Sequence, residues 1–270
     1  MDCQLVVVDL DNTFLNNRKE ISPASYAILD TLKQRNIAFG IASGRAVESV
    51  LRSMEAWGIT SYVDFVIGSN GNSVYDVHQQ KKKRFYTIDG TICLKIMEAF
   101  QDIEGVFFVL NGPERMIPYS NDWTQANAAY YSETDHVVDL PAYLQSQEIE
   151  KFVFHCHPKD MEKVKKRYQS VQDPSLVGYP SAPELFDIMH AGVDKGNALK
   201  WILRQYHIPW QAVLAFGDAE NDQPLLKEAG HGVCMKNGTQ STKDMADAIT
   251  SYTNDEDGVA RYITSYIKTI

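Results

Sequence analysis

Two aspartates separated by one residue follow the first apolar run of the chain. Leu5–Val8 is short, continuous and mostly β-branched, and it leads directly into Asp9 and Asp11. Such runs are typical of strands buried on both faces of a parallel sheet, and ligands bind at the carboxyl ends of such strands. Carboxylates bury at low cost only with a cation, a proton or a partner, and Mg²⁺ prefers oxygen ligands. The pair favours a metal site, with an N-cap and a turn aspartate as the alternative.

A second acidic segment follows another expected strand. Ala212–Phe216 is apolar, and the five residues from Asp218 to Asp222 contain three carboxylates and the amide of Asn221. Acidic oxygens at a second strand end favour the same metal site, although a solvated acidic loop is the alternative.

Two further segments could bind an anion. Ser43 and Gly44 follow an expected strand at 37–42 and precede a helix, so a hydroxyl and free helix N–H groups could hold a phosphate. Lys195 precedes a helix expected at 197–206 and could neutralise phosphate charge. Taken alone, a plain N-cap and a surface lysine are the alternatives.

The elements around these residues alternate between strands and helices. Ser22 and Pro23 indicate a helix start, a second helix is expected at 46–57, and a third strand at 65–67. This order predicts a doubly wound, Rossmann-like α/β sheet with right-handed crossovers. A β-hairpin at 73–88 follows, and its basic residues are interpreted as a solvated turn at 79–82 rather than a nucleic-acid patch.

The middle of the chain has a different pattern. Strand alternation becomes less regular and helices become amphipathic, which predicts a mixed α+β domain at 87–188. The first pattern returns afterwards, so residues 1–86 and 189–270 are expected to form one core interrupted by a cap. The two linkers are expected near Thr87 and between Pro183 and Gly192.

Composition restricts the classes of partner. The chain has 270 residues and a net charge of −9, which argues against nucleic acid or an anionic membrane as the main partner. Its four cysteines are far apart, as in reduced proteins. The N-terminus has no signal-peptide pattern, and no apolar run is long enough to cross a bilayer. We therefore expect a cytoplasmic protein, either a monomer or a homodimer.

The order, strand-end placement and chemical types of the acidic, hydroxyl and lysine segments resemble the four motifs of haloacid dehalogenase superfamily phosphatases. The sequence is most similar to the Cof-type, or class IIB, branch. Further stretches resemble that branch, namely 67–71, 184–188 with 192–197, 230–235 and 255–259. The resemblance covers the core almost end to end, but in the cap it is limited to place and size.

The resemblance implies roles for the two aspartates and for a metal. Asp9 is expected to attack phosphorus and become an aspartyl phosphate, while Asp11 is the general acid and then the base. Asp9, Asp218 and the backbone carbonyl of Asp11 are expected to bind Mg²⁺, and Asp222 to hold a metal-bound water.

The resemblance also implies a phosphate site. Ser43 with Gly44 would bind the phosphoryl oxygens, Lys195 would neutralise them and orient Asp9, and Asn221 would support the phosphate. Asn12 stands where the family usually has glycine, and asparagine tolerates a positive φ.

The interpretation is a Mg²⁺-dependent phosphomonoesterase for a small phosphorylated metabolite, first of all a sugar phosphate. A phosphosugar mutase, a receiver-type signalling protein and a non-catalytic phosphometabolite sensor are the alternatives. The cap is expected to select the leaving group, with His155 and His157 as residues to test. They are two apart on an expected strand and would share one face.

Overall fold

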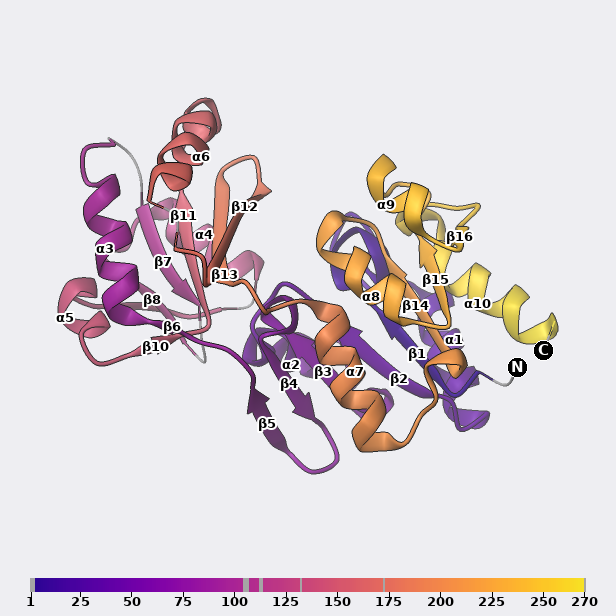
Figure 1. Ribbon diagram of the computed structural model, residues 1–270. Coiled ribbons are helices and arrows are strands. Elements are labelled where there is room, and N and C mark those ends of the chain that lie inside the picture. The colour runs from indigo at the N-terminus through magenta and orange to yellow at the C-terminus, as the bar shows by residue number, and fades with distance from the viewer. Residues whose placement is uncertain (1–2, 104–106, 112–113, 132, 172, 270) are drawn as a thin grey trace. The chain divides into compact units, whose positions relative to one another are not determined.

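The computed structural model describes residues 3–103, 107–111, 114–131, 133–171 and 173–269. The chain forms two compact units, of which the first joins residues 1–83 to 194–270 and the second spans 84–193. The sequence placed these boundaries at 87 and 188. Figure 1 shows both units, with most of their helices and strands labelled.

An 8-stranded sheet forms the centre of the first unit, in the order β16-β15-β14-β1-β2-β3-β4-β5. The pairs from β16 to β3 are parallel, whereas β4 runs antiparallel to β3. The strands are β1 (Leu5–Val8), β2 (Ala38–Ala42), β3 (Phe65–Gly68), β4 (Ser73–Asp76), β5 (Lys81–Arg84), β14 (Val213–Gly217), β15 (His231–Cys234) and β16 (Ala248–Ile249).

Helices cover both faces of this sheet, as the predicted doubly wound fold requires. Apolar side chains of α1, α2 and α10 form one buried cluster with β1 and β2, including Val6, Val8 and Ile41. Figure 1 shows α7 and α8 side by side against the face turned to the viewer. The helices are α1 (Pro23–Gln34), α2 (Val47–Ala56), α7 (Lys195–Tyr206), α8 (Gln223–Glu228), α9 (Gln240–Met245) and α10 (Gly258–Thr269).

Local signals explain where these helices begin. The Ser22 hydroxyl accepts the Ser25 N–H and Pro23 occupies the first turn, as predicted. The Asp194 side chain accepts the Asn197 N–H, which makes Lys195 the first residue of α7. The prediction that this helix begins at residue 197 was therefore two residues late.

The second unit contains a 6-stranded sheet in the order β12-β13-β11-β7-β8-β9 and a small sheet of β10 and β6. Its elements are β6 (Ile88–Asp89), α3 (Gly90–Phe100), β7 (Phe107–Asn111), β8 (Arg115–Ile117), α4 (Asp122–Tyr130), β9 (Asp135–Val137), α5 (Leu140–Leu144), β10 (Glu148–Ile149), β11 (Lys151–His155), α6 (Met161–Ser170), β12 (Leu176–Ala182) and β13 (Leu185–His190). Apolar side chains of α3, α5 and α6 pack on one sheet face around Phe152 and Phe154. This arrangement is the α+β architecture that the sequence predicted.

Three local predictions were wrong. The basic residues from Lys81 to Arg84 form strand β5 at the edge of the sheet, and the turn lies at 77–80. Charged side chains on an edge strand oppose pairing with another chain. The segment from Pro183 to Gly192 contains β13 and is therefore not an open linker.

The third wrong prediction was that His155 and His157 lie on one strand and share one face. Strand β11 ends at His155, whose ring lies 3.5 Å from the Trp123 ring, centroid to centroid. His157 lies beyond the strand, where its Nδ1 accepts the Lys159 N–H at 3.2 Å. The two-residue periodicity of a strand therefore does not give both rings the same environment. Burial lowers the pKa of His155, and the nearby Glu184 carboxylate only partly opposes this.

Among the described residues, no helix has the length and apolar character needed to cross a membrane.

Candidate active site

The register of the parallel sheet places three predicted segments at one edge. Val8 pairs with Ile41 on one side and with Phe216 on the other. The residues that follow these strands are Asp9, Ser43 and Asp218, and the Asp9 N–H donates to the Phe216 carbonyl at 3.0 Å. The sheet therefore brings together side chains from distant parts of the chain at its carboxyl edge, where open α/β sheets bind ligands.

Lys195 connects this edge to the first turn of α7. Its Nζ lies 2.7 Å from Asp9 Oδ1 and 2.5 Å from Asp222 Oδ1, and its side chain is fully buried. The backbone approaches closely here, because a Cβ on Gly71 would lie 2.1 Å from the Asp194 carbonyl oxygen. Burial would lower the pKa of Lys195, but the carboxylates of Asp222 and Asp9 outweigh it and raise that pKa. The ammonium is therefore fixed in its charged form.

Asp9, Asp218 and Asp222 form a compact acidic group. One carboxylate oxygen of each lies within 4.8 Å of the others, and all three residues are buried. Burial raises the pKa of Asp9 well above its ordinary value against the effect of Lys195, and neighbouring carboxylates raise it further. Burial and the Asp222 charge raise the pKa of Asp218 to about 7. One lysine does not balance this concentration of negative charge.

The acidic loop has a fixed shape because its own atoms bond to one another. Asp222 Oδ2 accepts the N–H groups of Asp218 and Ala219 at 2.9 and 3.1 Å, while Oδ1 pairs with Lys195. The Thr13 hydroxyl donates to Asp218 Oδ1 at 3.0 Å. Asp222 therefore closes the loop, and Asp218 contacts the segment that follows β1 through Thr13.

These donors suit a hard divalent cation. Such ions take oxygen ligands, and Mg²⁺ is commonly held by one or two carboxylates together with waters and phosphate oxygens. Asp9 and Asp218 offer carboxylate oxygens from neighbouring strand ends, whereas both Asp222 oxygens already have partners. The group could therefore hold a divalent metal ion, and Asp9 and Asp218 have more carboxylate oxygens available for it than Asp222.

Asp11 has different surroundings from Asp9. Arg45 donates two hydrogen bonds to the Asp11 carboxylate, from Nε to Oδ2 at 2.9 Å and from Nη2 to Oδ1 at 2.7 Å. Lys19 Nζ donates to Oδ1 at 2.8 Å. Burial would raise the pKa of Asp11, but the two cations outweigh burial and lower it. Its carboxylate is not part of the acidic group formed by Asp9, Asp218 and Asp222.

Asn12 turns the chain between the two aspartates and the following helical turn. Its φ is +62°, so the left-handed conformation expected for this departure from glycine is present. The Asn237 amide donates to the Asn12 carbonyl oxygen at 2.8 Å. The substitution is therefore compatible with the loop.

The predicted phosphate segments meet around Asn70. Its N–H donates to the Ser43 carbonyl at 3.0 Å, and its side-chain oxygen accepts the Asn221 amide at 3.0 Å. A Cβ on Gly44 would lie 3.0 Å from that same oxygen, so glycine permits the approach. The Ser43 hydroxyl accepts the Arg45 N–H at 3.1 Å.

Three residues of this region received no role from the sequence. Arg45 follows Ser43 and Gly44 directly, and Asn70 lies in a stretch noted only for its family resemblance. Lys19 carried no pattern at all, because its importance depends on a turn with φ of +62° at that residue. The signal that could have identified Arg45 is a long cationic side chain directly after a predicted phosphate segment.

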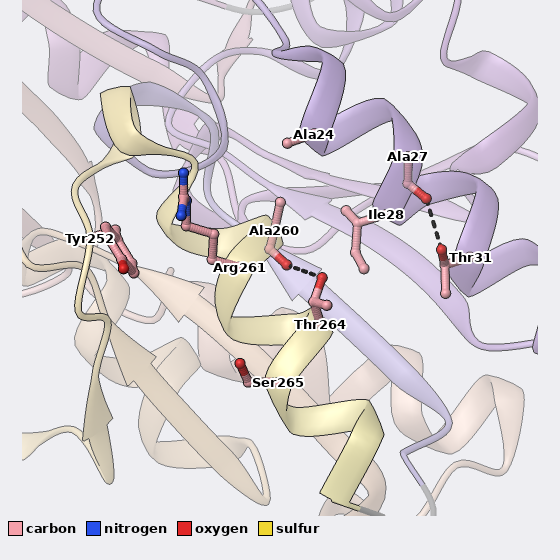
Figure 2. A pocket seen from close by; sticks show the side chains of 9 residues that line it. All are labelled: Ala24, Ala27, Ile28, Thr31, Tyr252, Ala260, Arg261, Thr264 and Ser265. Atoms are coloured by element: carbon pink, nitrogen blue, oxygen red, sulfur yellow. Dashed lines mark hydrogen bonds between the residues drawn. The ribbon is translucent and has the colours of Figure 1, made fainter.

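A separate cavity of about 460 Å³ lies between α1 and α10. Figure 2 shows its lining, which includes Ala24, Ile28, Ala260 and Tyr252. The hydroxyls of Thr31 and Thr264 donate to carbonyl oxygens of their own helices and so offer little to a ligand. None of the residues predicted for catalysis lines this cavity.

The fold and the acidic edge define the class of protein. The family model for haloacid dehalogenase-like hydrolases matches residues 6–263, so the chain belongs to this family. It is a hydrolase of the phosphatase type, as the sequence predicted.

Two curated relatives match over nearly the whole chain. Phosphatase YwpJ of Bacillus subtilis is 29% identical over 95% of this chain and 97% of its own length. The B. subtilis protein named 5-amino-6-(5-phospho-D-ribitylamino)uracil phosphatase YitU is 27% identical, with 97% of each chain covered.

Solved structures share the fold. A haloacid dehalogenase-like hydrolase from Bacteroides thetaiotaomicron matches with a TM-score of 0.88 at 24% identity, covering 98% of this chain and 100% of its own. The HAD subclass IIB sugar phosphatase BT4131 matches with a TM-score of 0.83 at 18% identity, covering 97% and 98%. At this identity the likeness supports the two-unit α/β fold and nothing finer.

Proposed function

We propose that the protein is a Mg²⁺-dependent phosphomonoesterase that hydrolyses a small phosphorylated metabolite through an aspartyl phosphate on Asp9. One observation carries this proposal. Two aspartates two positions apart have opposite environments, since Asp9 lies with Lys195 among buried carboxylates and Asp11 lies between Arg45 and Lys19. Paired carboxylates that are separated in this way suit two different chemical roles.

In the first step, an Asp9 carboxylate oxygen attacks phosphorus, and the bond from phosphorus to the leaving oxygen breaks. Asp11 gives its proton to the leaving oxygen, so the product leaves as an alcohol. Arg45 and Lys19 favour the ionised form of Asp11. The negative charge of a bound phosphoryl group opposes them and favours the protonated form that this step needs.

In the second step, a water molecule attacks the phosphorus of the aspartyl phosphate. Asp11, now a carboxylate, takes a proton from that water while the bond between Asp9 and phosphorus breaks. Inorganic phosphate leaves and Asp9 is regenerated. A carboxylate nucleophile thus divides the hydrolysis into two easier steps.

Charge neutralisation is the other requirement of phosphoryl transfer. Bound Mg²⁺ would supply the charge that lets an anionic aspartate approach an anionic phosphate. Lys195 holds Asp9 at 2.7 Å and brings a permanent positive charge to the same place. Ser43, Gly44 and Asn221 are the proposed phosphate partners, since Asn70 joins their segments.

Sugar phosphates are the first proposed substrates, and the second unit is the proposed source of substrate choice. Two relatives carry the name 5-amino-6-(5-phospho-D-ribitylamino)uracil phosphatase, so that compound belongs in the first substrate set. A screen of phosphorylated metabolites, ranked by kcat/KM, decides between these classes.

The test of mechanism uses p-nitrophenyl phosphate and acid-quenched protein after exposure to a ³²P-labelled substrate. We expect Mg²⁺-dependent phosphate release and acid-stable label on the wild-type protein. Asp9→Asn should fold, yet lose both turnover and label, because an amide is a poor nucleophile and a poor metal ligand. Asp30→Asn is the matched control, since Asp30 accepts an exposed hydrogen bond from Tyr62 and lies outside the proposed site, so the variant should behave as wild type.

Retention of a substantial share of kcat by Asp9→Asn would contradict the covalent route. Label without turnover would instead favour a receiver-type protein, and transfer of label to a second sugar hydroxyl would favour a phosphosugar mutase.

A further inference from the structure

A tight turn follows the proposed nucleophile loop. The Asn16 side-chain oxygen accepts the N–H groups of Arg18 and Glu20, each at 2.9 Å, and the Asn16 N–H donates to the Glu20 carbonyl. Lys19 has a φ of +62°, a conformation that reverses the chain direction. The turn thereby returns the Lys19 ammonium to Asp11, which lies eight positions earlier, at 2.8 Å.

A segment near the C-terminus braces this turn. The buried Asn254 amide donates to the Leu15 carbonyl oxygen and to Asn17 Oδ1, both at 3.0 Å. Asp255 accepts the Asn17 N–H at 2.7 Å and also the Asn17 side-chain amide. The base of the turn is therefore bonded to residues more than 230 positions later in the chain.

Arg45 contacts both oxygens of Asp11, and the turn adds a second cation, Lys19, at Oδ1. Arg45, whose side chain is almost fully buried, holds the carboxylate from the β2 side. Lys19 holds it from the turn, with a side chain 21% exposed. The Asp11 carboxylate itself is 28% exposed, so solvent reaches it and its orientation depends on these two partners.

We propose that the Asn254–Asp255 segment and the turn form a positioning device for Asp11, with Lys19 as its contact residue. The proposal rests on the general acid and base role of Asp11 given above. Lys19 does not exchange the proton; it acts by fixing the direction of the Asp11 carboxyl relative to the leaving oxygen.

The leaving group makes this role measurable. Nitrophenolate leaves without a proton, whereas an alkoxide needs one, so a misplaced acid slows alkyl esters more than nitrophenyl esters. Because kcat/KM reports events up to formation of the aspartyl phosphate, it isolates the step in which Asp11 is the acid. Complete loss of a general acid has an effect of roughly 10²–10⁴-fold, and misplacement has a part of that effect.

The experiment compares kcat/KM for p-nitrophenyl phosphate and for the best alkyl phosphate of the substrate screen. In Lys19→Met we expect a loss of about tenfold or more for the alkyl ester and less than about threefold for the nitrophenyl ester. Lys19→Arg should restore most of the alkyl activity. Arg18→Gln is the matched control, because Arg18 lies in the same turn but pairs with Glu20 at 2.9 Å, and it should change neither value.

Asn254→Ala tests the brace from the other end and should change the ratio between the two esters in the same direction. If this variant does not fold, Lys19→Met on the turn still decides the question. Equal losses on both esters would show that Lys19 attracts the phosphate dianion, and no loss would show that it is idle; either result overturns the proposal. A wild-type protein without phosphatase activity would instead refute the proposed function itself.

Discussion

The acidic group predicts a large and pH-dependent stabilisation by Mg²⁺. Asp9 and Asp218 are buried carboxylates whose pKa values are raised, and for Asp218 to about 7. A cation that binds only the folded protein stabilises it by about 2.7 kcal/mol at a concentration of one hundred times its Kd. For a domain of 150–250 residues, 1 kcal/mol corresponds to roughly 2–4 °C in Tm. At pH 7.5 we therefore expect saturating Mg²⁺ to raise Tm by roughly 5–11 °C.

Lower pH should reduce this shift, because protons compete with the metal for Asp218. With a pKa of about 7, protonation at pH 5.5 weakens apparent metal affinity by roughly thirtyfold relative to full ionisation. The same Mg²⁺ concentration then stands at only about three to four times the apparent Kd. The stabilisation falls to roughly 1 kcal/mol, or about 2–4 °C.

The assay is differential scanning fluorimetry of the full chain after chelation, with and without Mg²⁺, at both pH values. Asp218→Asn should lose most of the shift, whereas Asp30→Asn should keep it. A shift of equal size in Asp218→Asn, or one that grows as the pH falls, would refute the assignment of the metal site.

Three further predictions follow from the same region. Without metal, Tm should fall as pH rises from about 4 to 7, because the folded protein binds the Asp218 proton more tightly than the unfolded chain; Asp218→Asn should flatten the profile in chelator. Lys195→Met removes the cationic partner of the buried Asp9 and Asp222 carboxylates. Urea unfolding should therefore report a free energy of unfolding lower by roughly 3–5 kcal/mol, and Mg²⁺ should restore part of it. Gly71→Ala places a Cβ only 2.1 Å from the Asp194 carbonyl oxygen at a φ of +103°, so we expect a lower urea midpoint and a lower kcat. Gly58→Ala is its control, because φ there is +67° but the space around a Cβ is open. That variant should lower the urea midpoint and leave kcat unchanged.

The core fold was predictable because its signals are local and repeated. The apolar run Leu5–Val8 matches β1 residue for residue, and the Ser22-Pro23 pair marks the start of α1. Alternation of strands and helices predicts a parallel sheet, and the rule for right-handed crossovers leaves few topologies for it. Because parallel strands end at one edge, the sequence alone predicts that Asp9, Ser43 and Asp218 lie together.

Boundaries were predicted less well where tertiary contacts override local pattern. Lys81 to Arg84 has the composition of a solvated turn, yet it forms a strand, since an edge strand needs only one partner and tolerates charge. His155 and His157 have strand spacing, but the strand ends between them. In both places the contacts of the strand with its neighbours in the sheet decide where the strand begins or ends, and local sequence pattern does not show these contacts.

The partners of Asp11 show most clearly why the site was only half predictable. Motif order and residue type indicate the groups that we propose to react, because chemistry restricts their types. The side chains that orient these groups need only be long enough to contact them. A lysine or arginine can do so from many different backbone positions. Lys19 arrives at Asp11 through a left-handed turn that Asn254 secures from the far end of the sequence. Such a residue differs from any surface lysine only once the turn and its brace are known, so positioning residues must come from structure even where catalytic residues can be inferred from sequence.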